Sequence, residues 1–355
     1  MPGLFQKIIR PILFRLSPET AHEVAIETLR VGLGTGFAQR IAAKHFTGRP
    51  FGSIKRFGLD FANPLGIAAG FDKNGVVVNQ IASLGFGFVE IGTVTYKPQK
   101  GNDKPRLFRL REDQALLNRL GFNNEGAEAI AKRLAKTRKQ CVVGVNIGKN
   151  MDVPNEEAVE NYLASFDLVY PHADYIAVNI SSPNTPNLRD LQKADNLDNL
   201  LSVLQRRNGE LNAKPLLVKI APDLNEAEIE AIVDVCLRLK IDGVIATNTT
   251  TLRGGLKTKN LDKFGAGGLS GKPLAARSNE VISTIYSYSK GKLPIVGVGG
   301  IFTANDAFEK FAAGASPGIY AAVADHDHGV DQLFVGDHLV RLRSPASFDT
   351  PLGVD

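Results

Sequence analysis

From about residue 60 onward, short apolar runs alternate with longer segments of helical periodicity. Runs typical of β-strands lie near 64–69, 87–92, 141–146, 174–179, 215–220, 242–247 and 294–298, and an eighth is expected near 315–321. Helical segments, for example 125–138 and 226–239, separate them. Such alternation favours a parallel sheet covered by helices, and eight strand–helix units close into a barrel. The sequence therefore predicts an α/β fold, a (β/α)8 TIM barrel over residues 51–316.

The size and glycine content of the chain agree with this prediction. A length of 355 residues suits one such barrel with a modest appendage. The 35 glycines gather beside the apolar runs and form no repeat. This placement is typical of tight strand–loop junctions in an α/β enzyme.

Residues 1–50 predict a helical extension. Phe5, Ile8, Ile9, Ile12, Leu13 and Leu16 share one helical face, and cations occupy the opposite face. A second helix is expected to begin after Ser17 as N-cap, with Pro18 and Glu19 in its first turn, and to end at Gly32 and Gly34. The two helices would form a hairpin. Such a hairpin could lie on an anionic membrane through residues 1–34, or its apolar face could pack on the barrel.

Composition limits the possible partners and compartments. The net charge is +5 and the pI about 9.1, but no basic run resembles a nucleic-acid arm, so an ordinary mildly basic enzyme is expected. Two cysteines, Cys141 and Cys236, sit in apolar surroundings and predict buried thiols in a reducing compartment. No segment has the ~18 consecutive apolar residues of a spanning helix, and the N-terminus does not resemble a secretory signal.

Polar residues gather where the predicted strands end. In a barrel these ends meet at one face, where function collects. The residues there include Lys73, Thr93, Asn146, Asn179, Asn184, Lys219, Thr247, Asn248 and Thr249. Each asparagine alone could cap a loop, but the set together suits a planar heterocycle with imide-like edges. The two lysines suit a carboxylate and an electron-rich ring.

Two glycine-rich segments bear on phosphate binding. Gly297, Gly299 and Gly300 follow an apolar strand, and Thr303 can cap the next helix. Bare backbone N–H groups at such a point suit a phosphate. The segment 267–271 either adds a second backbone contact or is a flexible loop.

These stretches together resemble dihydroorotate dehydrogenase. Residues 63–73, 118–124, 179–185 and 267–271 are similar to that family, and the resemblance covers roughly residues 5–316. Residues 16–22 and 105–109 resemble its class 2, quinone-reducing branch. The resemblance implies an FMN-dependent oxidation of dihydroorotate to orotate in pyrimidine biosynthesis, with a membrane quinone as final acceptor. It also implies peripheral attachment to the cytoplasmic face of the cell membrane.

The resemblance further implies roles for individual residues. By its place in the matched motif, Ser182 would be the base that removes the C5 proton. A soluble branch of the family has cysteine there, so the serine favours class 2. A water or a neighbouring threonine would take the proton onward. The implied pyrimidine-binding residues are Lys73, Asn118, Arg119, Leu120, Gly121, Phe122, Asn179, Asn184, Asn248 and Thr249. The implied flavin-binding residues are Ala69, Gly70, Phe71, Asp72, Lys73, Thr93, Asn146, Asn179, Lys219, Thr247, Gly271 and Gly300. His22 and Arg109 would line the quinone tunnel.

The segment after Ser316 departs from the family, which continues with a hydrophobic eighth strand and a closing helix. Here Pro317 and Gly318 fall at strand positions, and no helical stripe follows. We expect residues 317–355 to be a divergent, loosely packed tail; the alternative is a short irregular strand around Tyr320. The chain is then either a working oxidoreductase or an inactive, unstable flavin barrel. His326 and His328 flank an aspartate, but without further ligands they do not predict a metal site.

Overall fold

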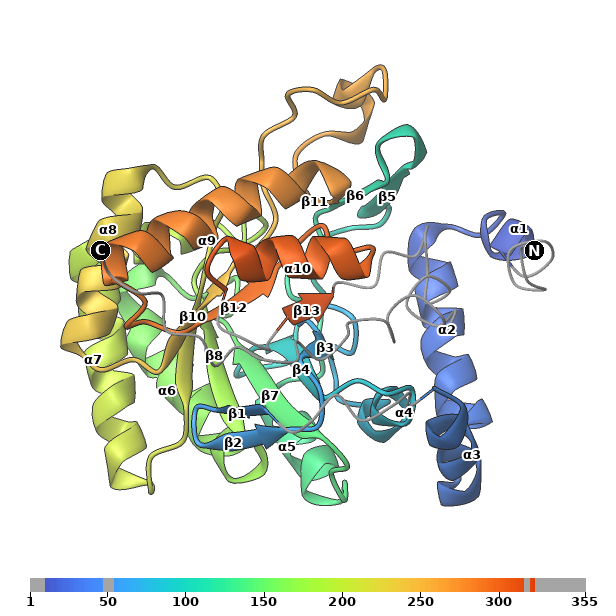
Figure 1. Cartoon of the computed structure of the whole chain (residues 1–355), viewed down its shortest axis with the longest axis horizontal. Helices are drawn as coiled ribbons and strands as arrows, with labels where there is room; N and C mark the ends of the chain where they lie inside the picture. The colour runs from blue at the N-terminus through green and yellow to red at the C-terminus, as the bar shows by residue number, and fades with distance from the viewer. Residues whose placement is uncertain (1–9, 47–53, 316–319, 323–355) are drawn as a thin grey trace, which may run out of the picture.

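A closed barrel of eight parallel strands forms the centre of the molecule (Figure 1). The structure is a computed structural model that describes residues 10–46, 54–315 and 320–322. The barrel strands are β3 (Leu65–Ile67), β4 (Phe88–Val94), β7 (Val142–Ile147), β8 (Tyr175–Asn179), β9 (Leu216–Ile220), β10 (Gly243–Ala246), β12 (Ile295–Val298) and β13 (Tyr320–Ala322). Seven of them lie where the apolar runs predicted strands, and β13 overlaps the position expected for an eighth, so the predicted TIM barrel is confirmed.

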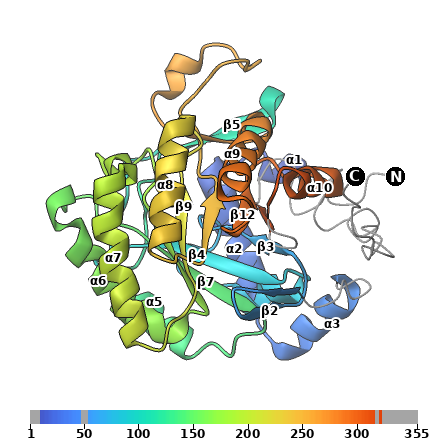
Figure 2. The ribbon, with the colours of Figure 1, turned by 60° about the vertical axis from the view of Figure 1, so that its left-hand side comes forward.

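Helices cover the outside of the barrel (Figure 2). They are α4 (Val78–Ser83), α5 (Ala127–Ala135), α6 (Ala158–Val169), α7 (Ala194–Glu210), α8 (Glu226–Arg238), α9 (Ala275–Ser289) and α10 (Ala304–Ala312). Local sequence sets their starts. Asn225 and Glu228 form a reciprocal capping box at α8, and Thr303 and Asp306 form one at α10. Their apolar faces join the buried core between helices and strands.

The eighth strand is present. Tyr320 of β13 pairs with Gly297 of β12 and with Leu65 of β3, and Ala322 pairs with Ile67. The favoured expectation of a loose tail is therefore wrong for residues 320–322, and the alternative of a short strand around Tyr320 is confirmed. Strand pairing uses backbone N–H and C=O groups, so three residues of Tyr and Ala suffice without a strong hydrophobic pattern. The predicted loose tail beyond Ala322, and the doubtful closing helix, lie outside the described residues.

A β-hairpin closes the barrel end at which the strands begin. It consists of β1 (Ile54–Arg56) and β2 (Leu59–Phe61), paired antiparallel. The Phe61 ring packs edge-on against Phe88 at a centroid distance of 5.7 Å, within a cluster of side chains from the barrel interior. This end is therefore filled with apolar side chains, and a ligand must enter from the opposite end.

A separate three-stranded antiparallel sheet stands beside the opposite end (Figure 1). Its strands are β5 (Leu107–Leu110), β6 (Ala115–Asn118) and β11 (Gly268–Gly271). Gly268 pairs with Asn118, and Leu269 pairs with Leu117. The sheet brings two motifs together that lie 150 residues apart in the chain, and it shows that residues 268–271 are a paired strand, not a flexible loop.

The N-terminal extension contains three helices in the described part of the chain: α1 (Arg10–Leu13), α2 (Pro18–Gly32) and α3 (Gly36–Phe46). The Ser17 hydroxyl accepts from the Thr20 N–H, so the predicted N-cap is confirmed, and α2 ends at Gly32 as predicted. Within the described residues the expected first helix is α1, and α2 is followed by a third helix, α3, which the periodicity did not separate. The predicted face from Phe5 to Ile9 lies outside the described residues.

The extension packs on the barrel and still exposes apolar side chains. Helix α2 contacts β5 and α4, and α3 contacts α4. Several large apolar side chains remain exposed, among them Ile12, Val24, Val31, Phe37 and Ile41. In the described ranges, no helix is both long and apolar enough to cross a membrane.

Candidate active site

One large cavity opens at the end of the barrel where the strands finish, beneath β6 and β11. Most of the residues predicted for catalysis, substrate, flavin and quinone line it: His22, Ala69, Gly70, Phe71, Lys73, Thr93, Asn118, Leu120, Gly121, Phe122, Asn179, Ser182, Asn184, Lys219, Thr247, Asn248, Thr249, Gly271 and Gly300. The fold thus brings together residues that are spread over some 280 positions of the chain.

Four predicted site residues do not line the cavity. The Arg119 guanidinium turns away from it, donates to the carbonyls of Pro105 and Ala266, and stacks on Phe108. The Asp72 carboxylate is buried and accepts from the N–H groups of the following loop. These two side chains stabilise the loops whose neighbouring residues line the cavity. The motif match included them because a matched segment contains side chains on both sides of its loop.

The other two residues lie behind or beside the cavity. Asn146 sits beneath its floor, where Thr93 Oγ1 donates to Asn146 Oδ1 at 2.6 Å. Arg109 donates to the Leu16 carbonyl at 2.9 Å, and its guanidinium lies over the Phe14 ring. Arg109 therefore joins β5 to the N-terminal extension.

A buried charge pair lies at the floor of the cavity. Lys219 Nζ is 4.0 Å from Glu90 Oε1, and both side chains are less than one-tenth exposed. The Glu90 carboxylate also accepts from Asn146 Nδ2 and from the Tyr175 hydroxyl, each at 3.0 Å. Burial lowers the pKa of Lys219, and the charge of Glu90 opposes that shift. The pair holds a cation under the cavity in a fixed place.

A hydrogen-bonded chain of amides and hydroxyls links the floor to the wall. Asn179 Nδ2 donates to Thr93 Oγ1 at 2.8 Å, and Asn248 Nδ2 donates to Asn179 Oδ1 at 3.2 Å. Asn248 also donates to Ser181 Oγ at 2.9 Å. Because each side chain orients the next, the polar edge is set before any ligand arrives.

Ser182 lies in the loop that follows β8. Its side chain is almost buried, and its Oγ accepts from the Asn184 N–H at 3.2 Å. Asn184 Nδ2 in turn donates to Asn118 Oδ1 at 3.1 Å, which links the loop to β6. Thr185 is also buried, and its hydroxyl has no hydrogen-bond partner within the described residues. The Ser182 hydroxyl and the Thr185 hydroxyl therefore lie within four positions of the same loop.

Lys73 is the second cation of the cavity. Burial lowers the pKa of Lys73 to about 8, although the charge of Glu19 opposes this shift. Glu19 comes from α2, lines the cavity, and forms an ion pair with Arg106 at 2.7 Å. The sequence reading assigned Glu19 only to the first turn of a helix, and no sequence signal distinguished its second role.

A glycine turn forms the wall that follows β12. Gly299 and Gly300 have φ angles of +111° and +68°, a region that favours glycine. A Cβ on Gly300 would lie 2.5 Å from the Ala275 Cβ, so the turn is packed too closely for a side chain. Thr303 caps α10 directly after it. This wall presents backbone to the cavity just before a helix N-terminus, as predicted for a phosphate.

Other site residues were missed by sequence reasoning. They are Leu107, Leu116, Leu274, Val298, Ile301 and Phe302. Ser270 and Gly299 also line the cavity, and both belong to the glycine-rich segments that the sequence singled out. Glu90 could have been found, because a carboxylate inside the apolar run 87–92 has no place in a barrel wall without a partner. Leu107, Leu116 and Ser270 belong to the β5–β6–β11 sheet, which no local pattern predicted.

The two thiols and the possible metal ligands do not add to the site. Cys236 is buried and Cys141 partly buried, both are free, and burial raises the pKa of each to about 12. Over the described ranges, no group of three His, Cys, Asp or Glu residues could hold a metal ion. His326 and His328 lie outside those ranges.

Comparison with known proteins gives a consistent result. The family model described as dihydroorotate dehydrogenase matches residues 53–330, beyond the residue at which we expected the resemblance to end. The chain is 50% identical over 316 residues to dihydroorotate dehydrogenase (quinone) of Christiangramia forsetii, covering 88% of this chain and 92% of that protein. It is 51% identical over 310 residues to the protein of the same name from Gloeobacter violaceus, covering 87% and 86%.

Solved structures show the same fold. The crystal structure of DHODH from Eimeria tenella in complex with ferulenol superposes with a TM-score of 0.78 at 35% identity, and the match covers 93% of each chain. The ligand-free structure from the same organism gives a TM-score of 0.79 at 37% identity, covering 91% of this chain and 93% of that one.

Proposed function

This chain belongs to the quinone class of the dihydroorotate dehydrogenase family, whose members oxidise dihydroorotate in pyrimidine biosynthesis, and on that premise we propose how its cavity carries out the reaction. The observation that carries the proposal is the convergence of Lys73, Lys219, Ser182 and the asparagines on one cavity at the barrel mouth. The cations suit anionic groups, and the amides suit a pyrimidine with alternating donors and acceptors.

The cavity fits FMN as cofactor. Lys219 supplies a fixed cation beneath an electron-rich ring, and Gly299 and Gly300 supply bare backbone where a phosphate would lie. Gly70 also lines the cavity, and a Cβ built on it would meet no atom within 4 Å, so the wall is open there. Ala69, Thr93, Thr247 and Gly271 would complete the contacts. When bound, FMN supplies hydride acceptance from C6 of dihydroorotate and electron transfer to the quinone.

Five side chains would bind the substrate. Lys73 would pair with the carboxylate, and Asn118, Asn179, Asn184 and Asn248 would bind the edges of the ring. The support for this assignment is that all four amides are already oriented by hydrogen bonds to one another or to Ser181. Thr249, Leu120, Gly121 and Phe122 would close the remaining sides.

Ser182 would remove the proton from C5. A serine needs a group that takes the proton onward, and no histidine lies in its loop. Thr185, whose buried hydroxyl has no hydrogen-bond partner in the described part of the chain, is the candidate within the protein. Its position three residues after Ser182 favours the threonine over a route through water alone.

The N-terminal extension would serve the quinone. His22 and Glu19 of α2 line the cavity, so a hydrophobic quinone ring could approach the flavin between α2 and the barrel. Arg109 would hold that entrance through its bond to the Leu16 carbonyl. The exposed Val31 and Phe37 would lie against the membrane, on the cytoplasmic face.

The division of the chain predicted from the sequence shifts at one boundary. Residues 1–50 would serve the membrane and quinone, and residues 51–316 together with β13 would form the flavin barrel, since β13 pairs within it. A divergent tail would begin only after β13. The alternative of an inactive barrel rested on a missing eighth strand. Since β13 pairs on both sides, that argument no longer holds.

The test is an anaerobic titration of the purified protein. Dihydroorotate should bleach the yellow flavin, and a soluble ubiquinone analogue should then restore the colour, whereas NAD⁺ at the same concentration should not. A colourless protein that takes up no added FMN would refute the cofactor assignment. A yellow protein that dihydroorotate does not bleach would refute the substrate assignment.

A further inference from the structure

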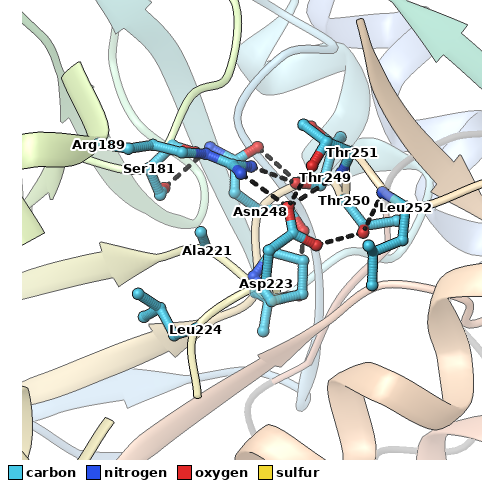
Figure 3. Close-up of polar contacts among 12 residues, drawn as sticks. Ser181, Arg189, Ala221, Asp223, Leu224, Asn248, Thr249, Thr250, Thr251 and Leu252 are labelled. Carbon is cyan, nitrogen blue, oxygen red and sulfur yellow. Dashed lines mark hydrogen bonds and ion pairs between the residues drawn. The ribbon is translucent and has the colours of Figure 1, made fainter. Parts of the chain in front are cut away.

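Behind the cavity wall, Arg189 connects the loops of three successive barrel strands (Figure 3). Its guanidinium makes three bonds at once. Nε donates to the Ser181 carbonyl at 3.1 Å, Nη1 to Asp223 Oδ2 at 2.7 Å, and Nη2 to the Thr249 carbonyl at 3.0 Å. Ser181 follows β8, Asp223 follows β9 and Thr249 follows β10. Arg189 does not line the cavity, so it does not bind a ligand there.

The first of these bonds acts on the peptide that carries the proposed base. The Ser181 carbonyl belongs to the peptide bond between Ser181 and Ser182. A hydrogen bond to that oxygen fixes the peptide plane, and with it the direction in which the Ser182 side chain leaves the backbone. The Ser181 side chain is meanwhile held from the other side by Asn248 Nδ2 at 2.9 Å.

The third bond closes a ring. Asn248 Oδ1 accepts from the Thr249 N–H at 2.8 Å, and the Thr249 carbonyl accepts from Arg189. The ring therefore runs from Arg189 to Ser181, to Asn248, to Thr249 and back to Arg189. It contains the peptide before the proposed base and two residues proposed to bind the substrate, so it sets the distance between them.

Asp223 holds the guanidinium in place. Its carboxylate pairs with Arg189 and also accepts from Thr250 Oγ1, the Thr251 N–H at 2.9 Å and Thr251 Oγ1 at 3.1 Å. The side chains of Arg189 and Asp223 are only 25% and 15% exposed, so this pair is screened less than an ion pair on the surface. The planar fork of an arginine can reach three acceptors at fixed angles, which a lysine cannot do.

We propose that Arg189, held by Asp223, is a positioning residue that fixes Ser182 relative to the substrate side chains of the β10 loop. This inference rests on the proposed role of Ser182 in dihydroorotate oxidation. Arg189 would act on the half-reaction in which dihydroorotate reduces the flavin. It would have no part in the half-reaction with quinone, because no residue of the ring belongs to α2 or β5.

The experiment compares the two half-reactions in Arg189→Ala. We expect flavin reduction by dihydroorotate to slow about 10–100-fold, since misplacing a catalytic group by about 1 Å has effects of this size. Orotate should bind several-fold more weakly. Flavin content, and quinone oxidation of flavin reduced with dithionite, should stay at the wild-type level. Added guanidinium should restore part of the lost rate.

Two further variants separate positioning from general stability. Arg207 forms ion pairs with Asp167 and Glu210 on the outside of the barrel, so Arg207→Ala is a matched control that should leave both half-reactions unchanged. Arg189→Lys keeps the charge and should fold even if the alanine variant does not; its rate should fall between those of wild type and Arg189→Ala.

A double variant tests whether Arg189 acts through Ser182. Ser182→Ala with Arg189→Ala should reduce flavin no more slowly than Ser182→Ala alone, because residues that act as a unit are not additive. Additive losses, unchanged reduction in both Arg189 variants, or parallel losses of both half-reactions and of flavin would each overturn the proposal. If Ser182→Ala itself reduces flavin at the normal rate, the assignment of Ser182 as the base fails. The orotate affinity of Arg189→Ala would still show whether the hydrogen-bonded ring positions the substrate side chains.

Discussion

Replacing Lys219 by methionine should destabilise the barrel, because it leaves the Glu90 carboxylate buried without its cation. The two groups lie 4.0 Å apart with side chains 6% and 3% exposed. Removing one partner of a buried ion pair typically costs about 3–5 kcal/mol. Glu90 keeps hydrogen bonds from Asn146 and Tyr175, so we expect the lower end, about 3 kcal/mol.

The assay is urea unfolding followed by circular dichroism, since the chain contains no tryptophan. Bound FMN adds its own stabilisation, so unfolding should be measured at several FMN concentrations and extrapolated to zero. Adding Glu90→Gln to Lys219→Met removes the isolated charge and should restore stability to within about 1 kcal/mol of wild type.

The control is an exposed pair of the same length. Lys55 Nζ and Asp60 Oδ1 of the β1–β2 hairpin are also 4.0 Å apart, but their side chains are 83% and 64% exposed. Lys55→Met should cost about 0.5 kcal/mol or less. The reasoning is refuted if Lys219→Met lowers the free energy of unfolding no more than Lys55→Met does, or if adding Glu90→Gln restores none of it. In either case, burial of the Lys219–Glu90 pair does not determine its contribution to stability.

Three other predictions concern the reaction. Ser182→Ala should retain flavin and slow its reduction by dihydroorotate about 10²–10⁴-fold in stopped-flow measurements, and an unchanged rate would exclude Ser182 as the base. Deleting residues 1–34 should abolish quinone reduction and spare flavin reduction; equal quinone turnover in the truncated protein would contradict the role of the extension. The pKa of Lys73 is lowered to about 8, so its charged form, which favours a carboxylate, is lost above that pH. Orotate affinity measured calorimetrically should therefore fall, approaching tenfold per pH unit above about 8, and Lys73→Met should bind weakly with no such slope.

The barrel and its polar mouth could be predicted because their signals are local. Several apolar runs carry, at or near their ends, a residue such as Asn179 or Lys219 that does not belong in a buried strand without a partner. The alternation of strands and helices makes the strands parallel, so the ends of all strands, with these residues, meet at one end of the barrel.

The β5–β6–β11 sheet and the Arg189 ring could not be predicted in this way. The pairing of Asn118 with Gly268 joins segments 150 residues apart, one of them rich in glycine. Arg189 bonds to two backbone carbonyls, and a sequence does not display where a carbonyl points. Arg119 was misjudged for a related reason, since its place within a binding motif does not reveal on which side of the loop it lies.

The seam of the barrel at β13 has a consequence for how the protein opens. Strand β13 has three residues and joins β12 through two register pairs and β3 through three, whereas β4 and β7 share five. Regions with few backbone pairs open at lower free energy than the core, so amides of β3 and β12 that face the seam should exchange with solvent before those of β4 and β7. The seam also adjoins Gly299 and Gly300, which directly follow β12. Transient opening there would loosen the proposed phosphate wall first. Local opening of the barrel at β13 and release of the cofactor would therefore occur together.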